Sequence, residues 1–309
     1  LMTSDAYDVI IIGGGPAGLT AGLYTSRARL TTLLLEKSAL GGQVIKTERI
    51  ENYPGFVSSI SGFELIHNLE EQAKGFGLTI TSAAAESITP INGRLIKVAS
   101  SEGEFRTRSL IIATGSEPRL LGAPGEERLT GRGVSYCATC DGAFFREKEV
   151  AVVGGGDAAI EEALFLSRLA RRVHIIHRRD QLRAVQILQE RARAEGSISF
   201  IWDTVVEEIL GDARVSGLRL KNLKDDTAST LTVDGVFIYV GLQPNTGWLA
   251  GLMPLTDDGL IVTNDLMETT LPGVFAAGDV RKKLLRQITT AVGDGATAAF
   301  AAEKYVQTF

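Results

Sequence analysis

Cysteine is scarce in this chain, which has only Cys137 and Cys140 among its 309 residues. Two thiols are too few for the disulfide framework that holds small secreted domains together. A structural zinc site needs four ligands. Beyond the two cysteines the chain offers only His67, His174 and His177, so such a site is not expected. One CxxC pair remains, and in a reducing compartment this spacing favours a redox role over a structural one.

Long apolar runs and an excess of positive charge are also missing. No run reaches the roughly 18 residues of a membrane span, and the formal net charge is −5. The start of the chain lacks the cationic and apolar regions of a secretory signal. We therefore expect a cytoplasmic protein with neither nucleic acid nor membrane as a partner.

Glycine is abundant, and several of the 34 glycines form a turn near the start of the chain. The apolar run 7–12 predicts a buried parallel strand, followed by a glycine turn, a helix to about Arg29 and a second strand ending at Glu36. Gly13, Gly15 and Gly18 fit the G-x-G-x-x-G pattern, which brings a pyrophosphate to the N-terminus of a helix. Glu36 stands where a carboxylate accepts hydrogen bonds from ribose hydroxyls.

The same pattern restarts about 140 residues later, with a strand from Glu149 and a turn that contains Gly154, Gly156 and Ala159. Its second strand ends in "HRRDQLR" instead of a carboxylate. The nearest acid there is Asp180, directly after the two arginines. Arginine side chains match a 2′-phosphate, so we expect Arg178, Arg179 and Arg183 to favour NADP over NAD. Two nucleotide folds of this kind predict FAD and NADPH as the cofactors, with hydride transfer between them.

The predicted fold class is therefore α/β, with two Rossmann-like, three-layer nucleotide-binding domains, the second inserted into the first. We expect an FAD-binding domain at 1–117, an NADPH-binding domain that carries the CxxC at 118–245, and the rest of the first domain at 246–309. The segments "GSEPR" and "GLQPN", which are rich in glycine and proline, are the expected hinges. Ser61 and Glu64 form a capping-box pattern that predicts a helix after them.

The dithiol lies in the inserted domain, just before the second nucleotide strand. A CxxC beside a βαβ unit is typical of redox sites, because the pairing lowers one thiol's pKa. Inert core thiols are the alternative. Asp141 follows the second cysteine, and an Asp-Gly pair is also a common turn. A partly buried carboxyl can supply the proton that thiol exchange needs, so both interpretations of Asp141 stay open.

With these motifs in place, the chain resembles the low-molecular-weight thioredoxin reductases over nearly its whole length. "CATCDG" is the most specific element. It stands in the family's order and spacing beside "GGGPAG", "GGQV", "ENYPGF", "IIATGS", "HRRDQLRA", "PGVFAAGDV" and "RQITTA".

The resemblance implies a role for each matching position. Cys140 would face the flavin, Cys137 would attack the disulfide of thioredoxin, and Asp141 would act as acid and base. The positions implied for FAD are Gly13, Gly15, Pro16, Ala17, Gly18, Glu36, Gly42, Gln43, Asn52, Thr114, Gly115, Gly278, Asp279, Arg286, Gln287 and Ala291. Those implied for NADPH are Gly154, Gly156, Asp157, Ala158, Ala159, Arg178, Arg179 and Arg183.

The family further implies a homodimer and an inserted domain that rotates, so that nicotinamide and dithiol reach the flavin in turn. Ala158 departs from the family, which commonly has serine or threonine there, and the lost phosphate hydrogen bond would cost about 1 kcal/mol. Two alternatives to an NADPH-dependent thioredoxin reductase remain. One is a flavin dithiol oxidase or ferredoxin-linked reductase, and the other is a redox-sensing flavoprotein that is not an enzyme.

Overall fold

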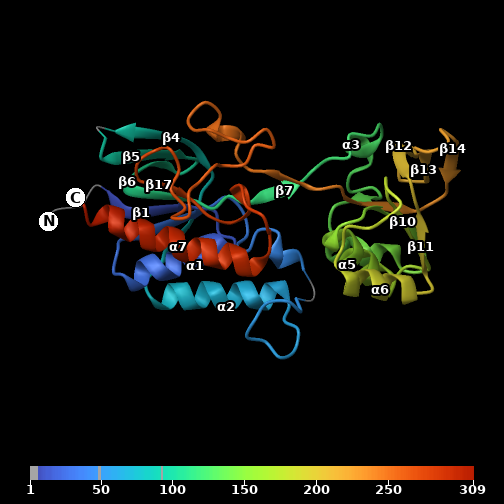
Figure 1. Cartoon of the computed structure of the whole chain (residues 1–309), viewed down its shortest axis with the longest axis horizontal. Helices are drawn as coiled ribbons and strands as arrows, with labels where there is room; N and C mark the ends of the chain where they lie inside the picture. The colour runs from blue at the N-terminus through green and yellow to red at the C-terminus, as the bar shows by residue number, and fades with distance from the viewer. Residues whose placement is uncertain (1–5, 48–49, 92) are drawn as a thin grey trace. The chain divides into compact units, whose positions relative to one another are not determined.

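The chain forms two compact units in a computed structural model that describes residues 6–47, 50–91 and 93–309 (Figure 1). Unit 1 consists of Leu1–Glu117 and Gln243–Phe309, and unit 2 consists of Pro118–Leu242. Unit 2 is thus inserted into unit 1, and both units are built around parallel strands with helices. The predicted α/β class, with a second Rossmann-like unit inserted into the first, is confirmed.

Unit 1 is organised around a seven-stranded sheet in the order β3-β2-β1-β6-β5-β4, with β17 also paired to β6. Strands β3, β2, β1, β6 and β17 run parallel, whereas β4 and β5 are antiparallel to their neighbours. The strands are β1 (Tyr7–Ile12), β2 (Thr32–Glu36), β3 (Thr79–Ser82), β4 (Ala85–Ile91), β5 (Leu95–Ser100), β6 (Gly103–Ile112) and β17 (Val274–Ala276). The helices are α1 (Pro16–Arg27), α2 (Gly62–Gly75), α7 (Ile288–Val306) and the short 3₁₀ turns η1 (Val44–Lys46), η3 (Gly247–Leu249) and η4 (Gly278–Val280).

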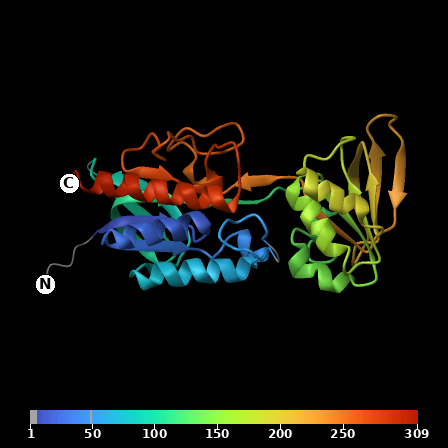
Figure 2. The same ribbon diagram turned by 60° about the horizontal axis from the view of Figure 1, so that its bottom comes forward.

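Alternating residues of β1 send their side chains into two different cores. Val9 and Ile11 pack with helix residues such as Leu19 and Ala298 on one face of the sheet. Ile10 and Ile12 pack on the other face with Val98 and the segment around Leu249. Helices α1, α2 and α7 lie together on the first face, as Figures 1 and 2 show. A strand that is buried on both faces explains the four consecutive apolar residues at 9–12.

Unit 2 repeats this plan with a parallel sheet in the order β11-β10-β9-β15-β8. A second sheet of three antiparallel strands has the order β12-β13-β14. The strands are β8 (Val134–Ser135), β9 (Glu149–Gly154), β10 (Arg172–Ile176), β11 (Ile198–Ile201), β12 (Thr204–Leu210), β13 (Gly217–Asn222), β14 (Ala228–Leu231) and β15 (Gly235–Tyr239). The helices are α3 (Glu126–Leu129), α4 (Ala138–Asp141), α5 (Asp157–Leu166), α6 (Gln186–Ala194) and the 3₁₀ turn η2 (Gly142–Phe145).

The parallel sheet of unit 2 lies between helices and the small sheet. Val150 and Val152 pack with Ile160 of α5 and Leu188 of α6 in one core. Ala151 and Val153 lie in a second core, which includes Val206, Leu218 and Leu220 from the antiparallel sheet. The small sheet is therefore the third layer of unit 2.

The chain passes between the units twice, at β7 (Ser116–Pro118) and at β16 (Leu242–Pro244), and these two short strands pair with each other. Both fall within or beside the segments predicted as hinges. Their pairing means that the two connections are joined by backbone hydrogen bonds.

Most elements predicted from the sequence have their expected places. The helix after Ser61 begins at Gly62, and Ser61 Oγ accepts a hydrogen bond from the Glu64 N–H at 3.1 Å. The helix after the first glycine turn ends at Arg27, two residues before the predicted end. Arg29 has φ 64°, a left-handed conformation that stops the helix.

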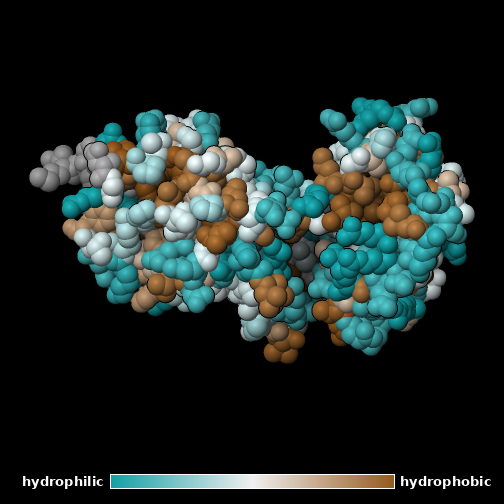
Figure 3. Space-filling model, turned by 45° about the horizontal axis from the view of Figure 1, so that its top comes forward, coloured by the Kyte–Doolittle hydropathy of each residue, from teal (hydrophilic) through white to brown (hydrophobic). Residues whose placement is uncertain are grey.

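The surface of each unit mixes hydrophilic and hydrophobic residues. Figure 3 shows the hydrophobic residues of one face as separate patches among hydrophilic ones. Fully exposed apolar side chains include Val57 and Leu284. No helix among the described residues is long and apolar enough to cross a membrane.

The packing of α7 on α1 generates the first prediction. A Cβ at Gly295 would lie 2.2 Å from the Ala17 carbonyl oxygen, whereas a Cβ at Gly293, on the same helix, would meet open space. Gly295→Ala should therefore lower the stability of the fold by about 1–3 kcal/mol, the usual effect of overpacking. Gly293→Ala should raise it by about 0.5–1 kcal/mol, since alanine is the better helix former.

Differential scanning calorimetry of the two variants measures this contrast in melting temperature. A Gly295→Ala protein that melts at or above the wild-type temperature would contradict the close approach of the two helices.

Candidate active site

The two cysteines form a disulfide at the start of a single helical turn in unit 2. Cys137 and Cys140 are bonded, with their Cα atoms 5.4 Å apart. Strand β8 leads into Cys137, which is the N-cap residue of α4, so Cys140 lies within the turn that follows. Spacing of three residues brings the two sulfurs together because residues three apart are neighbours on a helix.

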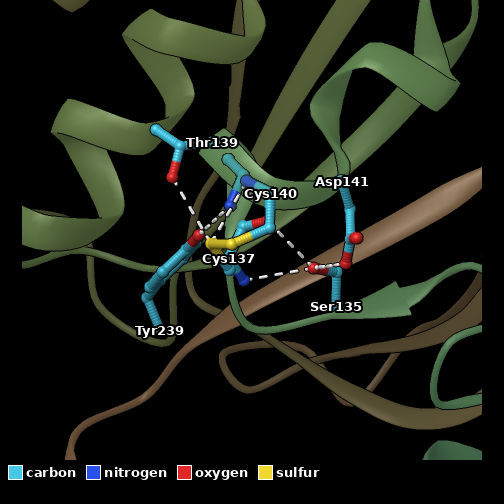
Figure 4. The surroundings of a disulfide bond; sticks show 7 residues. Ser135, Cys137, Thr139, Cys140, Asp141 and Tyr239 are labelled. Atoms are coloured by element: carbon cyan, nitrogen blue, oxygen red, sulfur yellow. Dashed lines mark hydrogen bonds between the residues drawn. A yellow bond between two sulfur atoms is a disulfide. The ribbon is translucent and has the colours of Figure 1, made fainter. Parts of the chain in front are cut away.

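The two sulfur atoms have different surroundings (Figure 4). The Cys140 backbone N–H donates a hydrogen bond to Cys137 Sγ at 3.2 Å, and Thr139 Oγ1 lies 3.3 Å from the same sulfur. Cys137 is 8% exposed, whereas Cys140 is an exposed residue. Hydrogen-bond donors at a helix N-terminus favour a thiolate, so negative charge is better stabilised on Cys137.

The carboxylate of Asp141 lies beside this disulfide and is held by a serine (Figure 4). Ser135 Oγ lies 2.6 Å from Asp141 Oδ2 and donates a hydrogen bond to it. The same Oγ accepts a hydrogen bond from the Cys137 N–H at 3.1 Å. Ser135 thus connects the acidic side chain to the backbone of the first cysteine.

Tyr239, at the end of β15, reaches the same helical turn. Its hydroxyl oxygen accepts a hydrogen bond from the Ala138 N–H at 2.9 Å. Burial raises the pKa of Tyr239 strongly, and the carboxylates of Glu162 and Asp141 raise it further. Tyr239 therefore stays a neutral hydroxyl that supports the first turn of α4.

The first glycine turn of unit 1 leaves the N-terminus of α1 open. Gly15 is the N-cap residue, and no side chain caps the helix. A Cβ at Gly15 would meet nothing within 4 Å, whereas a Cβ at Gly18 would lie 1.9 Å from the Gly13 carbonyl oxygen. These are the two demands of the G-x-G-x-x-G pattern, an open approach for a phosphate and close packing of helix on strand. Glu36 Oε2 accepts a hydrogen bond from the Gly14 N–H at 2.7 Å, which places the carboxylate at this turn.

The other positions predicted to bind FAD in unit 1 gather around this turn. A Cβ at Gly278 would lie 2.9 Å from the Cβ of Ala17 and 3.9 Å from that of Ala291. A Cβ at Gly42 would lie 3.9 Å from Gly15, and one at Gly13 would lie 3.0 Å from Thr114 N.

Two other predicted FAD positions, Asn52 and Gln287, contact each other: Asn52 Nδ2 donates to Gln287 Oε1 at 3.1 Å. A third, Gly115, accepts a hydrogen bond at its carbonyl from the N–H of Asn245, which was not predicted, at 3.0 Å. Gln43 is the N-cap residue of η1 and follows Gly42, and Arg286 is exposed just before Gln287. Pro16 is the first residue of α1.

Asp279 stands out because one of its oxygens is buried without a hydrogen bond. Asp279 Oδ1 makes no hydrogen bond, and Lys283 Nζ is 3.4 Å away. Lys283 Nζ also donates to Asp294 Oδ2 at 3.1 Å, and Arg281 contacts the other oxygen of Asp294 at 3.2 Å. Burial raises the pKa of the Asp279 carboxyl, an effect that the positive charge of Lys283 opposes. A buried carboxylate oxygen of this kind is suited to a ligand hydroxyl.

The second glycine turn, in unit 2, opens the N-terminus of α5. Gly156 is its N-cap residue, with no side-chain cap and with open space at its Cβ position. Asp157 Oδ1 accepts a hydrogen bond from the Val185 N–H at 2.8 Å. Ala159 is buried against Gly154, and Ala158 is exposed.

The three arginines of "HRRDQLR" lie beside this turn. The Arg183 N–H donates to the Gly155 carbonyl at 2.7 Å, and the side chains of Arg178, Arg179 and Arg183 are all exposed. Burial lowers the pKa of His177, and the positive charges of Arg183, Arg179 and Arg178 lower it further, so all three lie near this histidine. Asp180 lies 3.6 Å from Lys224, so the nearest acid contacts a lysine.

The sequence analysis did not identify two residues at the disulfide, Ser135 and Tyr239. Ser135 is two positions before Cys137, and serine hydroxyls often bond to nearby backbone groups. This local pattern could have predicted its hydrogen bond with the Cys137 N–H. Tyr239 is 101 positions from Ala138 and becomes its neighbour only through the pairing of β8 with β15. Among the described residues, no group of three or more His, Cys, Asp or Glu is arranged to hold a metal ion.

The structure combines two Rossmann-like units with a disulfide at the start of a short helix. This combination defines the class of protein as an oxidoreductase with two nucleotide-binding units and a redox-active disulfide. Comparison with known proteins agrees: residues 7–295 match the family model described as pyridine nucleotide-disulphide oxidoreductase. The thioredoxin reductase of Listeria monocytogenes is 53% identical over 97% of this chain and 94% of its own length. That of Bacillus subtilis is 48% identical over 97% and 95%.

Solved structures give the same result. The thioredoxin reductase of Lactococcus lactis is 49% identical, with a TM-score of 0.96 over 98% of this chain and 100% of that one. The enzyme of T. acidophilum is 33% identical, with a TM-score of 0.92 over 97% of this chain and 99% of its own. The chain belongs to the pyridine nucleotide-disulphide oxidoreductase family and, within it, to the thioredoxin reductases.

Membership in this family implies a flavin and a nicotinamide nucleotide as cofactors. The residues of unit 1 fit a flavin dinucleotide, since the uncapped N-terminus of α1 suits a pyrophosphate and the buried Asp279 oxygen suits a hydroxyl. The open N-terminus of α5 fits the second nucleotide in the same way.

The raised pKa of Asp279 generates the second prediction. Its carboxyl contributes stability below its ordinary pKa of 3.8, and this contribution is lost as the pH rises through the higher pKa of the folded state. Asp279→Asn should therefore melt at a similar temperature to the wild type near pH 4, and at a higher temperature near neutral pH.

The measurement is a series of melting curves of flavin-free protein at several pH values. Asp258→Asn, an exposed aspartate of the same unit, is the control and should follow the wild type. An Asp279→Asn protein that is less stable than the wild type at neutral pH would contradict the assignment.

Proposed function

We propose that this chain is an NADPH-dependent thioredoxin reductase. It takes two electrons from NADPH and passes them through FAD and the Cys137–Cys140 pair to the disulfide of thioredoxin. One NADPH and one proton are consumed, and NADP⁺ and thioredoxin dithiol are formed. The observation that carries the proposal is the asymmetric disulfide at the start of α4, in a chain that also has two open helix N-termini after glycine turns.

The dithiol chemistry follows from the difference between the two sulfurs. FAD, when bound, accepts hydride from the nicotinamide and supplies the two electrons. Electrons that reach the exposed Cys140 break the S–S bond, and Cys137 leaves as a thiolate that the Cys140 N–H stabilises. This agrees with Cys140 as the flavin-facing sulfur and Cys137 as the nucleophile.

Exchange with thioredoxin then takes two displacements. The Cys137 thiolate attacks one sulfur of the thioredoxin disulfide, which forms a mixed disulfide and releases one thioredoxin thiolate. The Cys140 thiolate attacks Cys137 Sγ, which restores the disulfide and releases the second thioredoxin thiolate. Each released thiolate takes up a proton, and we assign this proton transfer to Asp141, which lies beside the disulfide.

Unit 1 is the proposed FAD-binding domain and unit 2 the proposed NADPH-binding domain. Three exposed arginines near the second glycine turn support NADPH over NADH, and none of them forms an ion pair with a carboxylate within the described part of the chain. Glu36 at the first turn supports a nucleotide with free ribose hydroxyls. Ala158 offers no hydroxyl to the phosphates, so the arginines supply the polar contacts that favour NADP.

The relay requires unit 2 to present the nicotinamide and the dithiol to the flavin at different times. We infer that unit 2 turns at the paired strands β7 and β16, since the chain passes between the units only there.

A homodimer and a cytoplasmic location stay predictions. A lone redox CxxC suits a reducing compartment, which supports the second of them. A ferredoxin-linked reductase or a dithiol oxidase would have no use for an arginine cluster at the second turn, and a non-enzymatic redox sensor would not need the asymmetric dithiol.

The arginines generate the third prediction. Arg179→Gln should raise the KM for NADPH about 10–100-fold, because a charge-assisted hydrogen bond contributes about 1.5–3 kcal/mol. The KM for NADH should not change. Arg219→Gln is the control, because Arg219 is an exposed arginine of the same unit that pairs with Glu208.

The measurement is the steady-state rate of thioredoxin reduction at increasing concentrations of each nucleotide. Equal weakening of NADPH and NADH would refute a 2′-phosphate contact for Arg179.

The cysteines generate the fourth prediction. Both Cys137→Ser and Cys140→Ser should keep NADPH-dependent bleaching of the flavin and lose reduction of thioredoxin. Only Cys140→Ser should form a stable mixed disulfide with thioredoxin, because it keeps the nucleophile and lacks the thiol that resolves the product. Mass spectrometry of the trapped complex distinguishes the two. A complex trapped with Cys137→Ser instead would reverse the assigned roles.

A further inference from the structure

Ser135 is a buried polar residue whose hydroxyl contacts both Asp141 and the backbone of Cys137. Ser135 is 4% exposed, so it is not available to bind thioredoxin. It lies on the edge strand β8, where it pairs with Phe237 of the neighbouring strand β15. The position of its hydroxyl is therefore fixed by the sheet and not by the dithiol helix.

The hydrogen bonds of Ser135 have a definite direction. A hydroxyl has one proton, and two acceptors compete for it: Asp141 Oδ2 at 2.6 Å and the Cys137 carbonyl at 3.2 Å. The shorter contact to a carboxylate is the stronger one, so the proton goes to Asp141. The lone pairs of Oγ then accept the Cys137 N–H at 3.1 Å.

We propose that Ser135 is a positioning residue for thioredoxin reduction, which holds the Asp141 carboxylate beside the disulfide through this hydrogen bond. The inference rests on the proton-transfer role of Asp141 proposed above. The hydroxyl fixes the orientation of the carboxylate, and it donates a hydrogen bond to the oxygen Oδ2.

Two carboxylates, those of Asp141 and Glu162, lie near Tyr239 beside the dithiol helix. Asp141 lies close enough to Tyr239 to raise its pKa, and Glu162 adds a second carboxylate at the same tyrosine. Tyr239 uses its hydroxyl oxygen for the Ala138 N–H. The Asp141 carboxylate accepts its hydrogen bond from Ser135 Oγ and not from this tyrosine.

The test compares kcat for reduction of purified thioredoxin disulfide between the wild type and its variants. Ser135→Ala should lower kcat about tenfold, because the carboxylate is no longer held in the orientation for proton transfer. Asp141→Asn should lower kcat at least as much. The KM for thioredoxin and the bleaching of the flavin by NADPH should not change.

Two further variants separate positioning from general damage to the fold. Ser135→Thr keeps the hydroxyl and should restore most of kcat. Ser199→Ala removes a serine hydroxyl that bonds to His174 Nδ1 at 2.8 Å on β11, at the opposite edge of the same sheet. It should leave kcat unchanged.

A double-mutant cycle gives the decisive result, because residues that act through one another are not additive. Ser135→Ala in an Asp141→Asn background should cause no further loss of kcat. Infrared spectroscopy gives a readout that does not depend on turnover: the carboxylate band missing in Asp141→Asn should shift in frequency in Ser135→Ala, because the carboxylate loses its hydrogen bond.

Each outcome either supports or overturns the inference. If Asp141→Asn alone leaves kcat unchanged, the role of Asp141 fails and this inference fails with it. If Asp141→Asn slows the enzyme but Ser135→Ala does not, only the positioning role is wrong. Additive losses in the double variant, or an unshifted carboxylate band, would also overturn it.

Discussion

One constraint of parallel sheets places the glycine turns and the dithiol in this molecule: neighbouring parallel strands in register end together at the same edge. In unit 1, Ile12 pairs with Leu35 and with Ile112, and Ile112 pairs with Ala276. The glycine turn, Glu36, Thr114 and the Gly278–Asp279 pair follow these four strand ends. Four chain segments therefore meet at one edge of the sheet, because the register of the backbone pairing brings the four strand ends together.

Unit 2 obeys the same constraint with different side chains. Val153 pairs with Ile176 and with Ile238, and Phe237 pairs with Ser135. The second glycine turn, the arginine segment, Tyr239 and the disulfide follow these strand ends. The nucleotide site and the dithiol thus share an edge, and Tyr239 touches both, since its carbonyl oxygen lies against Gly154 and its hydroxyl against α4. Because one sheet positions both groups, the nucleotide site and the dithiol must move together as parts of a single unit.

Sequence alone predicted the features whose causes are local. Glycines 13, 15 and 18 need open backbone and close packing within a few residues, and the structure meets both demands. The capping box at Ser61 and the CxxC turn are equally local. Ser135 is close to the cysteines in the sequence. Its hydrogen bond to Asp141 could not be predicted, because that bond depends on the orientation of the Asp141 side chain. The small sheet β12-β13-β14 was not predicted, although the buried Leu218 and Leu220 alternate with the exposed Arg219 in β13.

Features that rest on distant partners required the fold. Lys283, Asp294 and Arg281 form an ion network under Asp279, but charged residues in a sequence give no sign of burial. Burying these charges is expensive unless they pair, so the network fixes the segment between η4 and α7 in one arrangement. Asp279 then keeps one buried oxygen without a hydrogen bond, which agrees with the use of polar groups at ligand sites rather than for stability alone.

The proposed direction of electron flow rests on a short element, the four residues of α4. In any such turn the N-cap side chain receives backbone N–H groups, and the residue three positions later supplies one of them. Cys137 is therefore the sulfur on which negative charge is stabilised, and Cys140 is the one left exposed. A disulfide whose two sulfurs differ in this way has a preferred leaving group, and exchange reactions proceed through the sulfur whose departure as thiolate is easier. The order of the two cysteines along the chain thus supports the roles proposed for them.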